Sequence, residues 1–320
     1  MRTWPPMASS IRKAAAAGAV LGAAGLLSLY LPYRVAFHSP RKGQNDIYRL
    51  PEGDQYESRA AEMREMIRRM DAEPYERVWV RSVDGLMLTG RLYLRGGENA
   101  PVDLCFHGYR ATGVRDFSGG ARCLLNWEHN VLLVDQRAQG ESEGRTITFG
   151  LEERQDCLTW LEYILNRWDI RGPITLYGVS MGAATVLLAS EFHLPERVKA
   201  IVADSPYSSA AAILEKVSRD MGLPGKPALA LLRGGAALFG GFRVRRADCV
   251  EAVKHTRVPI LLIHGEEDRF VPVEMSREIA EANPGKVKLI TFPGAGHGLS
   301  YMTDRERYER ELRAFLEAAR

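Results

Sequence analysis

The sequence is poor in cysteine and contains none of the common cofactor-binding motifs. Its cysteines, Cys105, Cys123, Cys157 and Cys249, are far apart and form no C-x-x-C pair, which argues against a metal site built from them. The patterns H-E-x-x-H, G-x-x-x-x-G-K and G-x-G-x-x-G are missing as well, so the sequence implies neither a metal nor a nucleotide cofactor. We expect the cysteines to be free, buried thiols.

The main body of the chain also lacks a strong net charge. The 320 residues carry 43 Lys and Arg against 40 Asp and Glu, a formal net charge of +3. Residues 1–74 hold 11 basic and 8 acidic residues, whereas the remaining 246 residues hold 32 of each. Because the whole excess precedes the main body, the composition argues against nucleic acid as its partner. The hydrophobic fraction of 46% suits one large α/β domain with extensions.

Charge is absent from residues 14–33, a stretch of 20 residues dominated by Ala, Leu, Gly and Val. About 20 apolar residues are enough to cross a bilayer as a helix. Arg2, Arg12 and Lys13 precede the stretch, so the positive-inside rule places residues 1–13 in the cytoplasm. We therefore predict a transmembrane anchor over residues 14–33 in a single-pass membrane protein, with the main body extracytoplasmic.

Two other interpretations of this stretch stay open. A cleaved signal peptide has a shorter apolar region and a small-x-small cleavage site, and Leu31 to Phe37 offers no convincing one. A buried amphipathic helix would show a polar face, which this stretch does not have. Tyr30 and Tyr33 fall where the aromatic belt of a membrane interface would lie.

Residues 34–74 are predicted to connect the anchor to the main body. Ser39–Gly53 is polar and contains Pro and Gly, which is typical of a linker. Tyr56–Met70 is predicted to be an amphipathic helix packed on the domain, because apolar residues recur in it at helical spacing, namely Met63, Met66, Ile67 and Met70.

Residues 75–320 are predicted to form an α/β domain. Arg77–Arg81 and Leu86–Leu94 alternate around the turn signal Asp84-Gly85, which predicts an antiparallel hairpin. Short apolar runs then predict strands buried on both faces: Val102–Phe106, Val131–Val134, Ile174–Tyr177, Ala200–Ala203, Ile260–Ile263 and Val287–Phe292. Helical patterns separate them: Gly119–Trp127, Glu152–Trp168, Ala183–Phe192, Val273–Ala282 and Thr303–Ala318. The predicted fold is a doubly wound, mostly parallel sheet fed by an antiparallel hairpin.

Residues 207–256 are too long for a simple crossover between strands. They contain Ala-rich helical pieces broken by Pro224, Pro227 and two Gly-Gly pairs, so we predict an inserted helical cap. The cap carries 8 Lys or Arg against 4 Asp or Glu. Such a balance is typical of a solvated face, and an anionic lipid surface or an acidic substrate is the alternative.

The most informative motif is Gly178-Val179-Ser180-Met181-Gly182. This G-x-S-x-G sequence lies between the apolar run Ile174–Tyr177 and a helical run of small residues, Ala183–Ser190. At a sharp strand-to-helix turn the serine hydroxyl projects from the backbone, and glycines let neighbouring elements approach. We predict that Ser180 is a nucleophile. An ordinary tight turn with an exposed serine would leave the partners described next unexplained.

A serine hydroxyl needs a general base, and the base needs an acid that orients it. Of the seven histidines, only His297 sits in a glycine-flanked loop just after the last apolar strand, at the carboxyl edge where Ser180 also emerges. We therefore predict His297 as the base, with a histidine in a surface turn as the alternative.

Two aspartates compete for the role of the acid. Asp268 follows the strand Ile260–Ile263 by a short loop and is the first candidate, since its carboxylate could hold the imidazole of the base. Asp204, at the end of the preceding strand, is the alternative and is otherwise a structural hydrogen-bonding residue. Glu266 and Glu267 lie earlier in the Asp268 loop and are expected to face solvent.

Acyl transfer also requires hydrogen-bond donors for the developing oxyanion, and fixed backbone N–H groups serve best. Met181 follows the nucleophile and starts a helix whose dipole adds to the effect. Tyr109, in the loop after the strand Val102–Phe106, is predicted to give the second N–H, with Gly108 letting the loop fold over the site. His107 is expected to be structural.

These motifs together resemble the α/β-hydrolase superfamily from about Tyr75 to the carboxyl terminus. They are His107-Gly108, Asp135-x-Arg137 with Gly140-x-Ser142, the Ser180 turn, the Asp268 loop and Gly296-His297. Within the superfamily the chain looks like the membrane-anchored, short-capped serine hydrolases related to monoacylglycerol lipases and the serine-aminopeptidase-like group. Where these families commonly have Asp-x-Arg-Gly-His-Gly-x-Ser, this chain has Asp135-Gln136-Arg137-Ala138-Gln139-Gly140-Glu141-Ser142, a segment that shapes the fold behind the site.

The predicted activity is that of a serine hydrolase working through an acyl-enzyme on a small acyl substrate, lipids included. The resemblance implies carboxylic esters first, with peptides, thioesters or acyl transfer on the same triad as alternatives. The cap is expected to shape the acyl pocket. A non-catalytic scaffold tethered to the membrane is the alternative from a different class. The sequence leaves the acyl group and the oligomeric state open.

Overall fold

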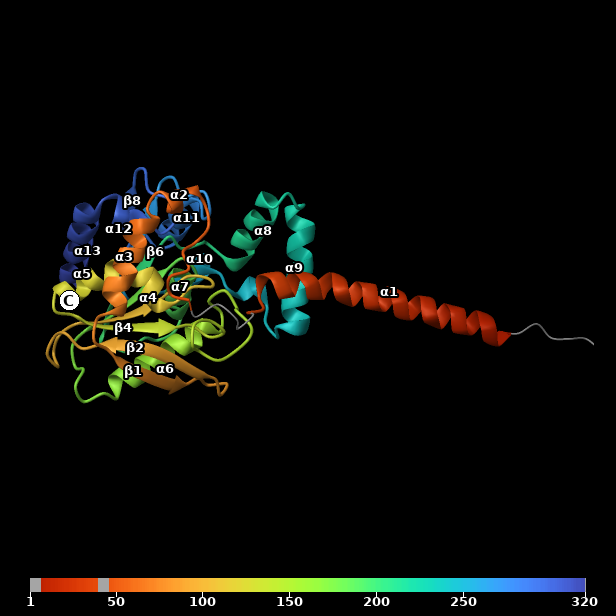
Figure 1. Ribbon diagram of the computed structural model, residues 1–320, viewed down its shortest axis with the longest axis horizontal. Coiled ribbons are helices and arrows are strands. Elements are labelled where there is room, and N and C mark those ends of the chain that lie inside the picture. The colour runs from red at the N-terminus through yellow and green to blue at the C-terminus, as the bar shows by residue number, and fades with distance from the viewer. Residues whose placement is uncertain (1–6, 40–45, 320) are drawn as a thin grey trace, which may run out of the picture.

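The computed structural model describes the backbone of residues 7–39 and 46–319, and the side chains of this part from residue 22 onward. One sheet of eight strands runs through the main body in the order β1-β2-β4-β3-β5-β6-β7-β8 (Figure 1). Its strands are β1 (Glu76–Arg81), β2 (Met87–Tyr93), β3 (Val102–Phe106), β4 (Asn130–Asp135), β5 (Ile174–Val179), β6 (Val198–Asp204), β7 (Ile260–Gly265) and β8 (Val287–Phe292).

The pairing confirms the predicted hairpin and the mostly parallel sheet. β1 pairs antiparallel with β2, and β2 pairs antiparallel with β4, so the hairpin forms one edge of the sheet. From β4 through β3, β5, β6 and β7 to β8 every neighbouring pair is parallel. All residues of β3 and β7 are buried, as expected for strands covered on both faces.

Helices cover both faces of the sheet, and each face has its own apolar core. One face is covered by α6 (Glu153–Leu165), α7 (Met181–Ala189), α10 (Cys249–Val253) and α11 (Val273–Ala282). The other is covered by α3 (Ala60–Asp71), α4 (Gly113–Phe117), α5 (Gly120–Asn126) and α13 (Arg305–Ala319). All four cysteines are buried, free thiols, as predicted.

The helix boundaries differ from the predicted ones in a few places. α7 begins at Met181, directly after Ser180, two residues before the run of small residues on which the prediction rested. α4 was not predicted, because it is only five residues long; Thr112 caps it by accepting a hydrogen bond from the N–H of Arg115 at 3.3 Å. The last predicted helix is preceded by a separate short one, α12 (Ser300–Thr303).

Residues 207–256 form two long helices beside the main body, and then a short turn and a short helix that lead back into the main body. These are α8 (Ala210–Asp220) and α9 (Gly225–Phe239), followed by the 3-10 turn η1 (Val244–Arg246) and α10. α8 packs on α9, whereas α10 packs against α7 and α11 in the layer of helices over the sheet. Only α8 and α9 therefore stand apart as a cap.

The predicted anchor falls within α1 (Met7–Ala36), one helix that projects from the body beside α8 and α9 (Figure 1). The side chains of residues 14–21 lie outside the described part of the chain. Among the described residues, no helix is both long enough and apolar enough to cross a membrane. The transmembrane anchor therefore stays a prediction.

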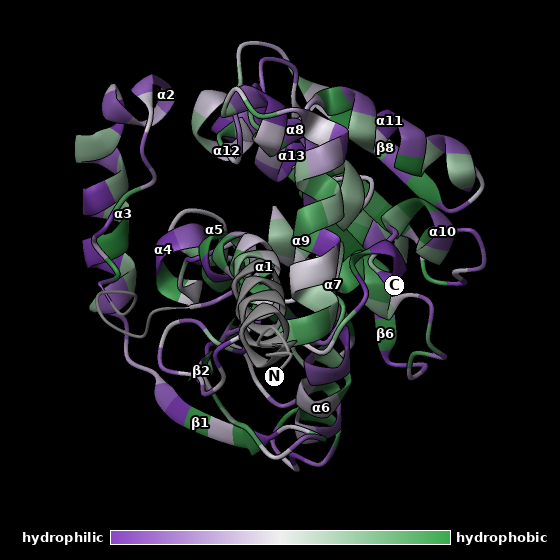
Figure 2. Ribbon diagram, turned by 90° about the vertical axis from the view of Figure 1, so that its right-hand side faces the viewer, coloured by the Kyte–Doolittle hydropathy of each residue, from purple (hydrophilic) through white to green (hydrophobic). Residues whose placement is uncertain are grey.

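The last turns of α1 pack on protein, which corrects the expectation that Tyr33 would belong to an aromatic belt. Tyr33 is buried, and its hydroxyl lies 2.8 Å from Oγ1 of Thr146. The ring of Tyr30 packs edge-on against Phe239 of α9, with 5.1 Å between centroids. Figure 2 looks along α1 and shows α9 at its side. Contacts between distant segments of this kind leave no mark in a local apolar pattern.

Candidate active site

Ser180 stands at the turn between β5 and α7 in a strained backbone conformation. Its φ of +55° lies in the left-handed region, which a residue with a side chain rarely adopts. The flanking glycines are required by close packing: a Cβ on Gly178 would lie 2.1 Å from the carbonyl oxygen of Gly182. A Cβ on Gly182 would lie 1.8 Å from the carbonyl oxygen of Phe106 in β3. The motif thus holds the serine at the carboxyl edge of the sheet.

The structure brings Ser180, His297 and Asp268 together in one hydrogen-bonded chain. Nε2 of His297 lies 2.9 Å from Oγ of Ser180, and Nδ1 lies 2.6 Å from Oδ2 of Asp268. An ionised carboxylate only accepts hydrogen bonds, so Nδ1 carries the hydrogen and Nε2 is free to accept the serine proton. All three side chains are buried. This geometry is that of a nucleophile, a base and an orienting acid.

Asp268 is held in its ionised form by several donors. Burial opposes ionisation, but the interaction and hydrogen bond with His297, a hydrogen bond from His264 and the backbone N–H of Val271 outweigh it and lower the pKa of Asp268. Oδ1 accepts hydrogen bonds from the N–H groups of Phe270 and Val271 at 2.9 and 2.8 Å. The carboxylate therefore has a fixed orientation toward His297.

His264 is a supporting residue that the sequence analysis did not single out. It is the fifth residue of β7 and fully buried, with Nε2 at 3.2 Å from Oδ2 of Asp268 and 2.8 Å from the carbonyl oxygen of Val271. Its Nδ1 lies 2.6 Å from Oγ of Ser276 in α11. The sequence did contain a signal for this role, because His264 stands near the end of a predicted strand, four residues before the candidate acid.

Asp204, the alternative acid, is bound elsewhere. Its Oδ1 accepts a hydrogen bond from Oγ of Ser205 at 2.9 Å, and its Oδ2 accepts one from the hydroxyl of Tyr308 at 3.1 Å. Burial raises the pKa of Asp204 despite these bonds. Its backbone carbonyl accepts the N–H of Ser180 at 2.8 Å, so Asp204 supports the turn beneath the nucleophile.

The two acidic residues earlier in the Asp268 loop face solvent. Glu266 is exposed and accepts a hydrogen bond from Oγ1 of Thr291 at 2.6 Å. Glu267 is also exposed. Neither side chain points into the hydrogen-bonded chain of Ser180.

The loop after β3 lies against Ser180, where an oxyanion would form. A Cβ on Gly108 would lie 3.4 Å from Cβ of Ser180, which shows how close this loop approaches. The N–H of Gly108 donates to Oδ2 of Asp116 at 2.7 Å, so it is not free to bind an oxyanion, and Tyr109 stays the predicted donor of this loop. Met181 begins α7, whose first N–H groups carry the partial positive charge of the helix.

A family model described as alpha/beta hydrolase family matches residues 104–311, which is more than half of the sequence. The chain belongs to the alpha/beta hydrolase family. The protein YqkD of Bacillus subtilis (strain 168) is 29% identical over 194 residues, which cover 60% of this chain and 63% of YqkD. The Homo sapiens protein ABHD12B is 32% identical over 195 residues, covering 56% of this chain and 50% of ABHD12B. The chain thus matches less than two thirds of either relative.

Solved structures share the fold of this chain. An esterase of Pyrococcus furiosus, Pf2001, superposes with a TM-score of 0.64, covering 79% of this chain and 93% of that one. The two are 22% identical, and at this level the likeness shows the fold alone.

His107 is structural, as expected. Its Nε2 accepts the N–H of Gln136 at 3.0 Å, and its Nδ1 lies 2.7 Å from the carbonyl oxygen of Gly108. Burial lowers the pKa of His107, which favours the neutral ring. The ring ties the loop after β3 to the loop after β4.

The departure from the common family motif lies directly behind this loop. Ala138 has a φ of +62°, a conformation that suits the glycine common at this position. Oε1 of Gln139, in place of the common histidine, accepts the N–H of Arg110 at 2.5 Å. Arg110 itself has a φ of +52°. Gln139 therefore fixes the residue that follows Tyr109.

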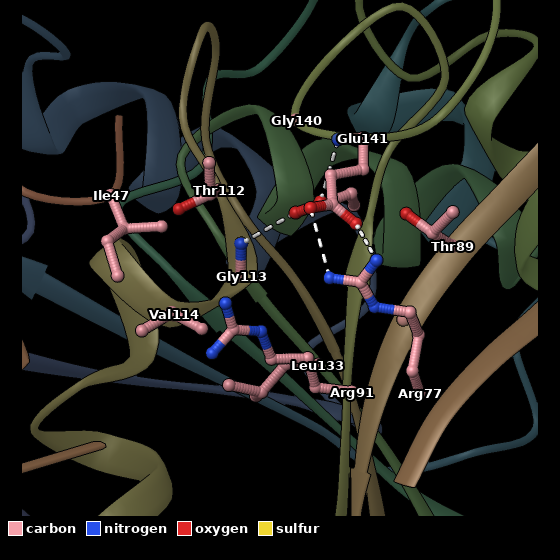
Figure 3. A pocket seen from close by; sticks show the side chains of 12 residues that line it. Ile47, Arg77, Thr89, Arg91, Thr112, Gly113, Val114, Leu133, Gly140 and Glu141 are labelled. Atoms are coloured by element: carbon pink, nitrogen blue, oxygen red, sulfur yellow. Dashed lines mark hydrogen bonds and ion pairs between the residues drawn. The ribbon is translucent and has the colours of Figure 1, made fainter. Parts of the chain in front are cut away.

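Asp135 and the residues around it enclose a small cavity of about 50 Å³ (Figure 3). The arginines that line it already face carboxylates: Arg77 lies 3.1 Å from Glu141, and Arg91 lies 2.7 Å from Asp71. This cavity has room for little more than water and lies away from Ser180, so it is part of the fold rather than a substrate site.

A larger cavity of about 290 Å³ opens at Ser180 and His297. Its lining is largely apolar and aromatic, with side chains that include Met63, Met66, Phe117, Phe270 and Met302. A mixed, mainly apolar cavity of this size suits a small organic substrate.

The wall of this cavity corrects the expectation about the cap. Within the part of the chain that the structure describes, no residue of 207–256 lines it, whereas residues between 51 and 66 do. In α2 (Asp54–Glu57), the hydroxyl of Tyr56 donates to the carbonyl oxygen of His297 at 3.0 Å, and Oε1 of Gln55 accepts the N–H of His297 at 3.2 Å. The α2–α3 segment, which precedes the sheet, thus covers the site and holds the backbone of His297.

Proposed function

We propose that this hydrolase cleaves carboxylic esters through a covalent acyl-enzyme. The observation that carries the proposal is the hydrogen-bonded chain from Ser180 through His297 to Asp268, buried beside an apolar cavity. Ser180 is the nucleophile, His297 the base and Asp268 the acid that orients the base. The likeness to the fold of an enzyme named as an esterase agrees with this proposal.

The reaction runs in two half-reactions. Oγ of Ser180 attacks the acyl carbon while Nε2 of His297 takes its proton, and the N–H groups of Tyr109 and Met181 bind the oxyanion. Collapse of this intermediate breaks the ester bond, and His297 returns the proton to the leaving alcohol. Water then attacks the acyl-enzyme with His297 again as base, releasing the acid and restoring Ser180.

A fluorophosphonate probe tests the nucleophile. The wild-type chain is expected to be labelled on Ser180, and Ser180→Ala is expected to lose both labelling and ester hydrolysis, with kcat falling about 10⁶-fold. Equal labelling of both chains would show that Ser180 is not the nucleophile, and no labelling of the wild type would favour the alternative of a membrane-tethered scaffold.

Substrate class needs its own comparison, because the same triad serves peptidases, thioesterases and acyltransferases. We expect p-nitrophenyl esters to be cleaved faster than aminoacyl-p-nitroanilides and acyl thioesters at equal concentration. A preference for the anilides would overturn the esterase proposal while leaving the triad intact.

We also propose that residues 14–33 anchor the chain in a membrane with the catalytic domain on the extracytoplasmic side. The uncharged stretch and the basic residues before it support this proposal. Protease added to intact cells should digest the catalytic domain. Full protection, with digestion only after lysis, would refute the orientation.

A further inference from the structure

The end of α1 lies on the loop that carries the proposed oxyanion donor. The last carbonyl groups of a helix have no partners within the helix and carry its partial negative charge. The hydroxyl of Tyr109 donates to the carbonyl oxygen of Ala36 at 2.9 Å. Nη2 of Arg110 donates to the carbonyl oxygens of Val35 and His38 at 2.7 and 3.2 Å.

Other contacts hold the residues on either side of Tyr109, and the ring of Tyr109 packs against Phe149 with 5.5 Å between centroids. The N–H of Gly108 is held by Asp116, and the N–H of Arg110 is held by Gln139. Arg110 is strained in the left-handed region, so it keeps its conformation only while its surroundings enforce it. Between these two anchored residues, the side chain of Tyr109 is tied to α1.

α1 is in turn positioned by α9 of the cap. A Cβ on Gly235 would lie 2.5 Å from the carbonyl oxygen of Leu29 and 3.0 Å from Cβ of Tyr33, so the two helices touch through their backbones there. A Cβ on the neighbouring Gly234 would meet only the end of the Leu29 side chain, at 2.7 Å, which can rotate away. Gly235, unlike Gly234, is thus needed for the docking of α1.

We propose that the docked end of α1 positions the oxyanion loop, so that hydrolysis depends on the packing of α1 against α9. Tyr109 and Arg110 are the positioning side chains, and they act through the backbone N–H of Tyr109. This inference rests on the proposed acyl-transfer function. It gives the cap a role although the cap does not line the cavity.

Two substitutions break this connection at different points. Tyr109→Phe removes one hydroxyl and leaves the backbone N–H, and Gly235→Ala displaces α1 from α9. Each is expected to lower kcat for a p-nitrophenyl ester about fivefold with little change in KM, the size of one lost hydrogen bond. The double variant should be no slower than the slower single variant, because both break the same connection.

Gly234→Ala is the matched control, since it makes the same change in the same helix without reaching the backbone of α1. It should keep the wild-type kcat. Tryptic cleavage after Arg34, which precedes the contacts with the loop, should be faster in Gly235→Ala than in Gly234→Ala. Melting temperatures of the full chains show whether each variant is folded.

The inference and the function on which it rests fail in different ways. A wild-type chain that is not labelled on Ser180 would overturn the proposed function. If the wild type is labelled on Ser180 but Tyr109→Phe keeps the wild-type kcat, the inference alone is overturned. It is also overturned if the loss of kcat in the double variant equals the product of the losses in Tyr109→Phe and Gly235→Ala.

Discussion

At the scale of single residues, the side chains that hold the proposed triad come from both ends of the chain. Gln55 and Tyr56 bind the backbone of His297 on both its N–H and its carbonyl oxygen. His264 lies within hydrogen-bond distance of Oδ2 of Asp268. A base fixed at its backbone and through its carboxylate partner loses little entropy on reaching the reactive geometry.

The two candidate acids are separated by matched amide substitutions. Asp268→Asn should lower kcat about 10⁴-fold, because an amide can donate to Nδ1 and stabilise the wrong imidazole tautomer. Asp204→Asn should leave at least one tenth of the activity, since Asp204 binds Ser205 and Tyr308 instead. Steady-state kinetics on one ester measures kcat for both variants. A larger loss of kcat in Asp204→Asn than in Asp268→Asn would assign the role of the acid to Asp204.

Tyr56→Phe tests whether the hydroxyl of Tyr56, which lies in α2 outside the sheet, helps to position His297. Loss of the hydrogen bond to the carbonyl oxygen of His297 should lower kcat about fivefold, or about 1 kcal/mol, with KM nearly unchanged. Tyr48→Phe is the control, because the exposed hydroxyl of Tyr48 bonds to Asp71 away from the site. Equal rates for wild type and Tyr56→Phe would show that Tyr56 only fills space.

At the scale of secondary-structure elements, α2 and α3 do what the cap was expected to do. α3 places Met63 and Met66 on the wall of the cavity at Ser180, while α9 packs against α1 and α8 packs on α9. The approach of α7 to β3 is the other decisive contact, because the backbone of Gly182 touches the carbonyl oxygen of Phe106.

Gly182→Ala is expected to destabilise the fold by about 1–3 kcal/mol or more, since α7 must move away from β3. Gly97→Ala is the matched control: it lies in a surface turn, and its Cβ would meet nothing within 4 Å. Urea unfolding of both variants measures the difference. Equal urea midpoints for Gly182→Ala and Gly97→Ala would mean that α7 and β3 can accommodate the added methyl group without a loss of stability.

Met66→Ala should shift the ester preference toward longer acyl chains, because it removes a side chain from the cavity wall. The shift in kcat/KM is expected to be about fourfold for each methylene newly accommodated. Met221→Ala, a change at an exposed methionine of the cap, should leave the preference unchanged. An unchanged profile for Met66→Ala would place the acyl chain elsewhere.

At the scale of the whole molecule, the proposed site connects three parts of the chain that are distant in sequence. The sheet supplies Ser180, Asp268 and His297, the α2–α3 segment covers them, and α1 reaches the loop of Tyr109. The electrostatic effects of the buried site also extend to the stability of the whole fold.

The lowered pKa of Asp268 predicts a stability that depends on pH. A carboxyl whose pKa is lower in the folded state stabilises the fold above its unfolded pKa of about 3.9, and this stabilisation is lost as the pH falls further. The difference in unfolding free energy between wild type and Asp268→Asn should be largest and constant above about pH 5, and should shrink progressively as the pH falls below about 4. A difference that did not shrink there would contradict an ionised, stabilising Asp268. Asp204, whose pKa is raised, contributes in the opposite sense.

Much of this arrangement could be predicted from the sequence. The hairpin and the parallel strands follow from apolar runs and turn residues, because a strand buried on both faces must be apolar along its length. Ser180, Asp268 and His297 each follow a predicted strand, and parallel strands end at one edge of the sheet. Local patterns and chain order were therefore enough to predict which residues would meet.

The rest was decided by tertiary packing. The same apolar and amphipathic patterns in α1 and α3 are compatible with a bilayer, a free surface or a protein neighbour, since hydrophobic burial has no directional preference. Only the folded chain shows that α3 covers the cavity, that α1 ends on the Tyr109 loop, and that His264 supports Asp268. These contacts join residues far apart in sequence, and they depend on shapes and distances that no local pattern encodes.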